Sequence, residues 1–222
     1  MTGRKIEESH YDQPEVAGAP LFKVENIGIK DLFKDISFEV YAGEIVGITG
    51  LLGSGRSELA RALFGLEKLT EGKVYLEGKE LHLHSVKDAI DHGISYVPED
   101  RLTEGLFLPH SIANNTVAAT LDKNLDKRHL LDKKKIRETT DNWTQEMKVV
   151  TPSGALPVQA LSGGNQQKVV LAKWLSNNPK VLILNSPTVG VDIGAKTDIH
   201  EYTRHLAAQG MAVIIISDDI PE

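Results

Sequence analysis

The stretch EIVGITGLLGSGRSELARALFGL, residues 44–66, joins an apolar run to a glycine-rich turn and then to a segment with helical spacing. The nearly continuous apolar run predicts a strand covered on both faces. The leucines and the phenylalanine after the turn recur at the intervals of an amphipathic helix. The stretch therefore predicts a buried strand, a tight loop and a helix, which is the first unit of an α/β fold.

The turn itself, GLLGSGRS at residues 50–57, matches the phosphate-binding pattern G-x-x-x-x-G-K-[ST], except that Arg56 replaces the lysine. Glycines let backbone N–H groups turn inward around phosphate oxygens, and the following helix adds its N-terminal dipole. Ser57 offers a hydroxyl to Mg²⁺, while Arg56 keeps the positive charge on a larger, planar group. The alternative is a glycine-rich turn that binds nothing. The residues predicted to contact a nucleotide here are Gly50, Gly53, Ser54, Gly55, Arg56, Ser57 and Glu58.

Composition limits the classes of protein that need to be considered. The 222 residues are 41% hydrophobic, carry a net charge of −6 and contain no cysteine. The absence of cysteine excludes disulfides, and the absence of a basic stretch argues against nucleic acid as a partner. No apolar run approaches the roughly 20 residues of a membrane-spanning helix, and the first residues lack a signal-peptide core. We expect a soluble, cytoplasmic chain that can dock on a membrane protein.

Beyond the first unit, predicted strands and helices alternate, which favours a parallel sheet with helices on both sides. Residues 1–20 are expected to be a tail or linker, and residues 102–160 a helical insertion. Because no helix follows the last predicted strand, we expect the chain to be a fragment truncated at its C-terminus. The predicted strands are 21–27, 36–40, 44–49, a hairpin of 73–78 and 80–84 around Gly78, 94–98, 180–188 and 211–217. The predicted helices include a short one capped by Ser85 and another over residues 111–121.

A second small-residue turn, LSGGNQQK at residues 161–168, also runs directly into a predicted helix. Ser162 adds a hydroxyl donor to the free N–H groups of that helix start, so this is a second candidate anion site. One small chain does not need two phosphate cradles for one nucleotide. The economical interpretation is that the second cradle serves a nucleotide held by another subunit.

With YVPEDR at residues 96–101 and VLILNSPTVGVD at residues 181–192, these motifs resemble the ATP-binding domain of an ABC transporter. Their forms are similar to the second, C-terminal half of tandem sugar-importer ATPases. The resemblance implies an ABC-type domain over residues 21–222, with a P-loop core and mostly parallel sheet, a small antiparallel β sub-domain and the helical insertion. It also implies ATP and Mg²⁺ as ligands, and a place on the inner face of the cell membrane. The implied partners are a second ATP-binding domain, transmembrane permease subunits and, indirectly, a sugar-binding protein.

Carried over residue by residue, the resemblance is uneven. The signature residues Ser162, Gly163, Gly164 and Gln166 fit the family pattern, as does Asp192. Four other positions depart from it: Glu99 stands for a glutamine, Asn185 for an aspartate that supports Mg²⁺, Ser186 for the catalytic glutamate and Asp218 for a histidine at the γ-phosphate. Phe33 is the candidate for stacking on adenine.

The departures predict a division of labour between two nucleotide sites. A neutral Asn185 weakens support for the metal, and Ser186 cannot accept a proton as a carboxylate does. We expect this domain's own loop to bind nucleotide weakly and to hydrolyse it slowly, while its intact signature closes over ATP held by the other half. Two alternatives are a catalytically silent module that binds nucleotide to hold a dimer, and an ABC ATPase acting on DNA or ribosomes. An ATPase acting on DNA or ribosomes would need long coiled-coil arms, zinc-binding cysteines or basic patches, and the sequence contains none of these.

Overall fold

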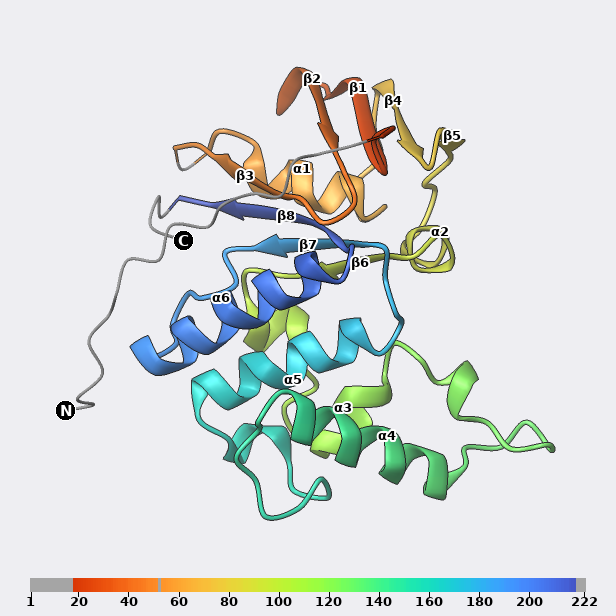
Figure 1. Cartoon of the computed structure of the whole chain (residues 1–222), viewed down its shortest axis with the longest axis vertical. Coiled ribbons are helices and arrows are strands. Elements are labelled where there is room, and N and C mark those ends of the chain that lie inside the picture. The colour runs from red at the N-terminus through yellow and green to blue at the C-terminus, as the bar shows by residue number, and fades with distance from the viewer. Residues whose placement is uncertain (1–17, 52, 219–222) are drawn as a thin grey trace.

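The computed structural model describes residues 18–51 and 53–218, which form two four-stranded sheets and the helices packed on them (Figure 1). The predicted tail lies outside these ranges except for residues 18–20, and the C-terminal residues 219–222 lie outside them as well. The elements in order are β1 (Phe22–Ile29), β2 (Phe33–Val40), β3 (Ile45–Thr49), α1 (Arg56–Leu63), β4 (Glu71–Leu76), β5 (Lys79–Leu81), α2 (Val86–Asp91), β6 (Ile94–Val97), η1 (Arg101–Gly105), α3 (Ile112–Val117), η2 (Asp122–Asn124), α4 (Lys133–Glu146), η3 (Val158–Ala160), α5 (Gly163–Leu175), β7 (Val181–Asn185), α6 (Ile193–Ala208) and β8 (Ala212–Ser217).

The parallel sheet has the strand order β3-β8-β7-β6, and each neighbouring pair is parallel. Its inner strands β7 and β8 are mainly apolar because both faces are covered. The burial predicted for residues 44–49 was wrong, because β3 lies at the edge of the sheet and none of its residues is fully buried. In β7, Val181 and Ile183 belong to one hydrophobic cluster, whereas Leu182 and Leu184 belong to the other. Side chains alternate between the two faces of a strand, so the continuous apolar run serves two cores at once. The predicted α/β fold with a mostly parallel sheet is confirmed.

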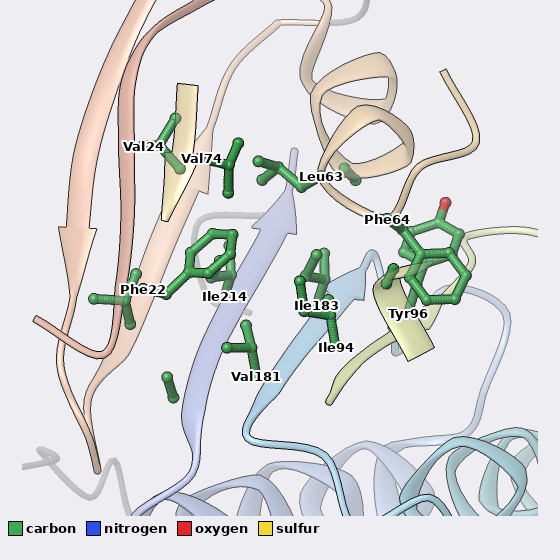
Figure 2. Close-up of a cluster of buried hydrophobic side chains, with 14 of the residues drawn as sticks. Phe22, Val24, Leu63, Phe64, Val74, Ile94, Tyr96, Val181, Ile183 and Ile214 are labelled. Atoms are coloured by element: carbon green, nitrogen blue, oxygen red, sulfur yellow. The ribbon is translucent and has the colours of Figure 1, made fainter. Parts of the chain in front are cut away.

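One face of the parallel sheet is covered by α1 and the antiparallel sheet, whose order is β2-β1-β4-β5. Figure 2 shows Phe22 and Val74 of the antiparallel sheet, Leu63 of α1 and Ile214 of β8 in a single cluster. This arrangement places α1 between the two sheets. The glycine-rich loop that precedes α1 is thereby held between the end of β3 and the antiparallel sheet.

The predicted hairpin around Gly78 is present as β4 and β5, but β5 is shorter than expected. It ends at Leu81, whereas the sequence predicted a strand to residue 84. The difference arises from the start of α2, because the His84 N–H donates to Asp88 Oδ2 at 3.0 Å instead of joining a ladder. Ser85 caps α2 as predicted, accepting a hydrogen bond from the Asp88 N–H at 3.2 Å.

The opposite face of the parallel sheet is covered by α5 and α6, and α3 and α4 lie beyond α5 (Figure 1). The helix predicted over residues 111–121 ends at Val117. Downstream polar side chains then bond locally, with Asn124 Nδ2 donating to Thr120 O at 2.8 Å, which favours a turn over continued helix. Among the described residues no helix is long and apolar enough to cross a membrane. The domain limits at residues 21 and 222, and 102 and 160, stay predictions.

Candidate functional site

The glycine-rich loop leaves the end of β3 and enters α1, as the sequence predicted. Gly55 is required by its positive φ and a close backbone contact, whereas Gly50 lies close to a side chain. A Cβ on Gly55, whose φ is 88°, would lie 2.9 Å from Leu32 O, and a Cβ on Gly50 would lie 2.6 Å from Ser54 Oγ. The backbone therefore makes a tight turn against the β1–β2 connection, which presents the first N–H groups of α1 at the loop.

Arg56, the residue in the lysine position, is held inside the loop. Its side chain is buried, with only 7% of the residue exposed. Nη1 donates to Gly50 O at 2.7 Å, and Nη2 lies 3.2 Å from Asp218 Oδ2. The buried Nε has no hydrogen-bond partner among the residues that the structure describes. An unsatisfied buried donor is costly, so this Nε is a candidate to meet an acceptor on a bound anion.

The residues predicted to support a metal ion lie together at the carboxyl end of the parallel strands. Ser57 Oγ donates to Glu99 Oε2 at 3.3 Å. Both residues line a cavity of about 400 Å³ together with Tyr96 and Asn185. Ser57 and Glu99 thus offer a hydroxyl and a carboxylate, both hard oxygen donors that suit Mg²⁺, and Asp100 and Glu104 line the same cavity. Asn185 adds a neutral amide, so the set fits the metal with one fewer charge than an aspartate would supply.

Asn185 and Ser186 end β7 with their polar atoms poorly satisfied. Asn185 is 2% exposed, its Nδ2 donates to Tyr96 Oη at a long 3.4 Å, and its Oδ1 has no partner among the described residues. Ser186 is 1% exposed and its Oγ also lacks a partner within that set. Its φ of 47° is unusual for a non-glycine residue, and its N–H donates to Ile216 O at 2.7 Å. A buried hydroxyl held this way cannot act as a solvent-facing base.

The second helix start is built around Ser162, which is the N-cap residue of α5. Its Oγ accepts from Asn165 Nδ2 at 2.9 Å, while Asn165 Oδ1 accepts from the Val150 N–H at 2.8 Å. Gln166 turns back, with Nε2 donating to Leu161 O at 3.2 Å. No described side chain caps the start of α5. Its first N–H groups remain available to an anion.

The two glycines after Ser162 have a packing role that the sequence did not reveal. A Cβ on Gly164 would lie 2.5 Å from Ala195 Cβ in α6. A Cβ on Gly163 would lie 2.9 Å from Arg101 Nη2 and 3.1 Å from Gly190 O. These contacts seat the start of α5 directly against α6 and against the loop that precedes it. Small residues are therefore required here by packing alone, independently of any bound phosphate.

Arg101 is a residue to which the sequence analysis gave no role, although it belongs to the quoted motif YVPEDR. Nη1 donates to Val189 O at 2.8 Å and Nη2 donates to Gly190 O at 3.0 Å. The guanidinium thus joins the segment after Glu99 to the loop that ends at Asp192. Asp192 in turn caps α6, with Oδ1 accepting from the Ala195 N–H at 3.0 Å. The only sequence signal was the position of Arg101 two residues after Glu99.

We expect the substitution Arg101→Met to loosen the loop over residues 188–192. It removes two charge-assisted hydrogen bonds to backbone carbonyls, which should lower the free energy of unfolding by about 1–3 kcal/mol. Amide hydrogen exchange should become faster across that loop. Arg137→Met is the matched control, because Arg137 is exposed and pairs with Asp141 on its own helix. Unchanged exchange at residues 188–192 in the Arg101 variant would contradict the assignment.

Lys173, on the α5 helix, links that helix to η1 from inside the protein. It is buried, its Nζ donates to Gly105 O at 2.5 Å and lies 4.8 Å from the centroid of the Trp174 ring. Burial lowers the pKa of Lys173 from 10.5 to about 8, because desolvation disfavours the ammonium form. The helix that begins at Ser162 is therefore tied to the segment after Glu99 by a group that titrates near physiological pH.

We expect the stability of the wild-type chain to rise with pH between about pH 8 and 10.5, relative to Lys173→Met. Below pH 8 the lysine is protonated in both states and the desolvation penalty is present in full. Above it, the folded state loses the proton first and the penalty is relieved, by at most about 3 kcal/mol. Denaturant unfolding across this pH range measures the difference, with the exposed Lys133→Met as control. Parallel curves for wild type and Lys173→Met would show the expectation to be wrong.

The two helix starts lie on opposite faces of the parallel sheet. Residues of α1 pack in the cluster that contains Ile183, whereas residues of α5 pack in the cluster that contains Leu184. Figure 1 shows α1 above and α5 below the strands. Phe33 lies beside the loop, because a Cβ added to Gly55 would be 3.2 Å from the Phe33 Cβ. Phe33 also packs on the hydrophobic core. Its stacking on adenine stays a proposal.

A glycine-rich loop between a parallel strand and a helix, with antiparallel and helical layers packed around it, defines a P-loop ATPase fold of the ABC type. The sequence profile of the ABC transporter family matches residues 33–189, and the chain belongs to that family. It is 42% identical over 222 residues to the ribose import ATP-binding protein RbsA of Clostridium tetani, covering all of this chain and 44% of the relative. The protein of the same name from Chromobacterium violaceum is 41% identical over 222 residues, again with 100% and 44% covered. The chain thus spans less than half the length of these curated relatives.

Solved structures agree on the fold. An ATP-binding cassette of an ABC transporter, MJ1267, has a TM-score of 0.77 at 22% identity and covers 91% of this chain and 83% of its own. A nucleotide-free ATP-binding cassette has a TM-score of 0.74 at 24% identity, covering 90% and 81%. At these identities the likeness shows the architecture alone. The predicted membership of the ABC transporter family is confirmed.

Proposed function

We propose that this chain is the second ATP-binding half of a bacterial sugar importer, working on the inner face of the cell membrane. The support is the 42% identity, over all 222 residues, to a relative named as a ribose import ATP-binding protein. Its length, less than half that of the relative, suits one half of a tandem protein. In this proposal the partners are the first half, the transmembrane permease and, through the permease, a sugar-binding protein.

Within that importer, we propose that the two helix starts of this chain have unequal tasks. The loop of residues 50–57 holds nucleotide through backbone N–H groups, Arg56 and Ser57, while Glu99 and Asn185 give limited support to Mg²⁺ through the shared cavity. ATP supplies the free energy that draws the two halves together. Ser162 and the open start of α5 donate to a phosphate held by the partner half, which rewards closure and moves the permease.

A second candidate function is a catalytically silent module that binds nucleotide only to stabilise the pair. The observation that favours it is the state of the hydrolytic positions: the buried Ser186 hydroxyl has no partner among the described residues, and Asn185 carries no charge. The two proposals differ in the role of Ser162. An importer half needs it for turnover at the partner's loop, whereas a silent module needs it only for association.

The test of the importer proposal is transport by the assembled protein. The longer protein that contains this chain, purified with its permease and placed in vesicles, should take up ribose or a related sugar when ATP is present on the side of the ATP-binding domains. Uptake should require the sugar-binding protein at the opposite side. ATP turnover without uptake of any sugar tested, while the complex is intact, would overturn the assignment as an importer.

A further inference from the structure

We infer that Arg56 and Asp218 form an internal ion pair that competes with nucleotide for the phosphate loop. The inference rests on the proposed function, since it assigns a regulator to the nucleotide site proposed above. It goes further by naming the group that restrains the site. Both residues depart from the family pattern, and the structure brings these two departures into direct contact at 3.2 Å.

The geometry ties up the cation that a phosphate would otherwise use. Arg56 donates through Nη1 to Gly50 O and pairs through Nη2 with Asp218 Oδ2, so two of its nitrogens are engaged within the loop's own surroundings. The side chain of Arg56 is 6% exposed, and that of Asp218 is 52% exposed. The arginine is thus fixed in place, while the aspartate can swing into solvent. The unpaired buried Nε is the donor that the pair leaves unsatisfied.

Charge explains why such a pair restrains binding. A phosphate oxygen and the Asp218 carboxylate are both acceptors for the Arg56 guanidinium, and both carry negative charge. Binding a nucleotide at the loop must therefore break the pair or place two anions on one cation. In a partly buried site this repulsion is screened less than at the surface. The Asp218 carboxylate therefore occupies Arg56 and lowers the affinity of the loop for nucleotide.

The substitution Asp218→Asn tests this pair directly. It keeps the size of the side chain and removes the charge, which frees Arg56 for a phosphate. We expect the 222-residue chain to bind ADP and ATP about 5- to 20-fold more tightly. This range lies between the effect expected for an exposed ion pair and that expected for a charge-assisted hydrogen bond. Asp218→Glu keeps the carboxylate and should stay near wild type. Asp91→Asn is the matched control, because Asp91 is 55% exposed and pairs with Lys87 at 2.8 Å far from the loop in sequence.

A double-mutant cycle separates the pair from simple repulsion. In an Arg56→Ala background, Asp218→Asn should improve affinity by less than about threefold, since no cation remains to be released. Equal gains in both backgrounds would overturn the inference, because Asp218 would then act on phosphate without Arg56. No gain in the wild-type background would overturn it as well. If neither wild type nor Asp218→Asn binds nucleotide, the loop is not a nucleotide site, and both this inference and the proposed role of residues 50–57 fail. The proposed role of Ser162 is tested separately.

Discussion

Replacing Ser162 with arginine is expected to lower the rates of sugar uptake and ATP turnover in the assembled transporter at least about 100-fold. Ser162 is the N-cap residue of α5, and its side chain makes no capping hydrogen bond to that helix start. An arginine there fills the space with a long cation and removes the hydroxyl donor. If the wild-type helix start binds a triphosphate on the partner half, the substitution prevents closure of the pair. The partner's phosphate loop then loses its activity as well. Uptake and phosphate release, measured on the same vesicles, report this loss.

The control for this prediction is Ser85→Arg, which places the same charge at another helix N-cap, that of α2. That variant loses a capping bond worth about 1 kcal/mol but lies on a helix with no proposed ligand. It should assemble and transport. A Ser162→Arg transporter that takes up sugar at the wild-type rate would remove the basis for the proposed role of α5. Loss of assembly in both variants would equally count against a specific role for Ser162.

The second large effect concerns the chain alone. The 222-residue protein is expected to hydrolyse ATP no faster than its Ser57→Ala variant, since the missing base by itself costs on the order of 10²–10⁴ in rate. At the glutamate position stands Ser186, whose hydroxyl is buried against the protein and whose backbone is fixed by its bond to Ile216 O. At the aspartate position stands the neutral Asn185. Neither residue carries a carboxylate, which is the group that would polarise an attacking water in the proposed division of labour.

Phosphate release from the purified chain, with and without Mg²⁺, measures this expectation. Turnover that persists unchanged in Ser57→Ala belongs to a contaminating enzyme and agrees with an inactive site. Turnover that is clearly above background in wild type, and lost on replacing either Ser57 or Arg56 with alanine, would show that this site splits ATP unaided. The proposed division of labour between the halves would then be wrong.

Part of the site could be predicted from the sequence because its signals are local. The loop of residues 50–57 and the turn at Ser162 each join a glycine-rich segment to a helix, and a tight turn that presents backbone N–H groups at a helix start uses glycine because it has no Cβ. The apolar strands were readable for a similar reason, since continuous runs such as residues 181–184 can be buried only on two faces. The parallel sheet and the ABC transporter family followed from these local patterns and their order.

Other features could not be read because they depend on residues distant in sequence. The contact of Arg101 with Val189 O and Gly190 O spans almost ninety positions, and no local pattern specifies it. The same holds for the packing of Gly164 against Ala195, which gives a structural reason for a glycine that had suggested only phosphate. The strand expected to reach residue 84 was wrong for a local reason, since the cap of α2, in which the His84 N–H donates to Asp88 Oδ2, ended it early.

The sequence by itself determined the order of strands and helices, the two helix starts and the five departures from the family pattern, Arg56 among them, because each is written in residues that are adjacent along the chain. Only the tertiary structure decided what those departures do to one another. Arg56 and Asp218 lie at opposite ends of the domain in sequence, and the parallel pairing of β3 with β8 brings them to the same edge of the sheet. Each of these two residues, considered alone, suggested the loss of a nucleotide-binding group. Together they form one ion pair, because the carboxyl ends of neighbouring parallel strands lie side by side.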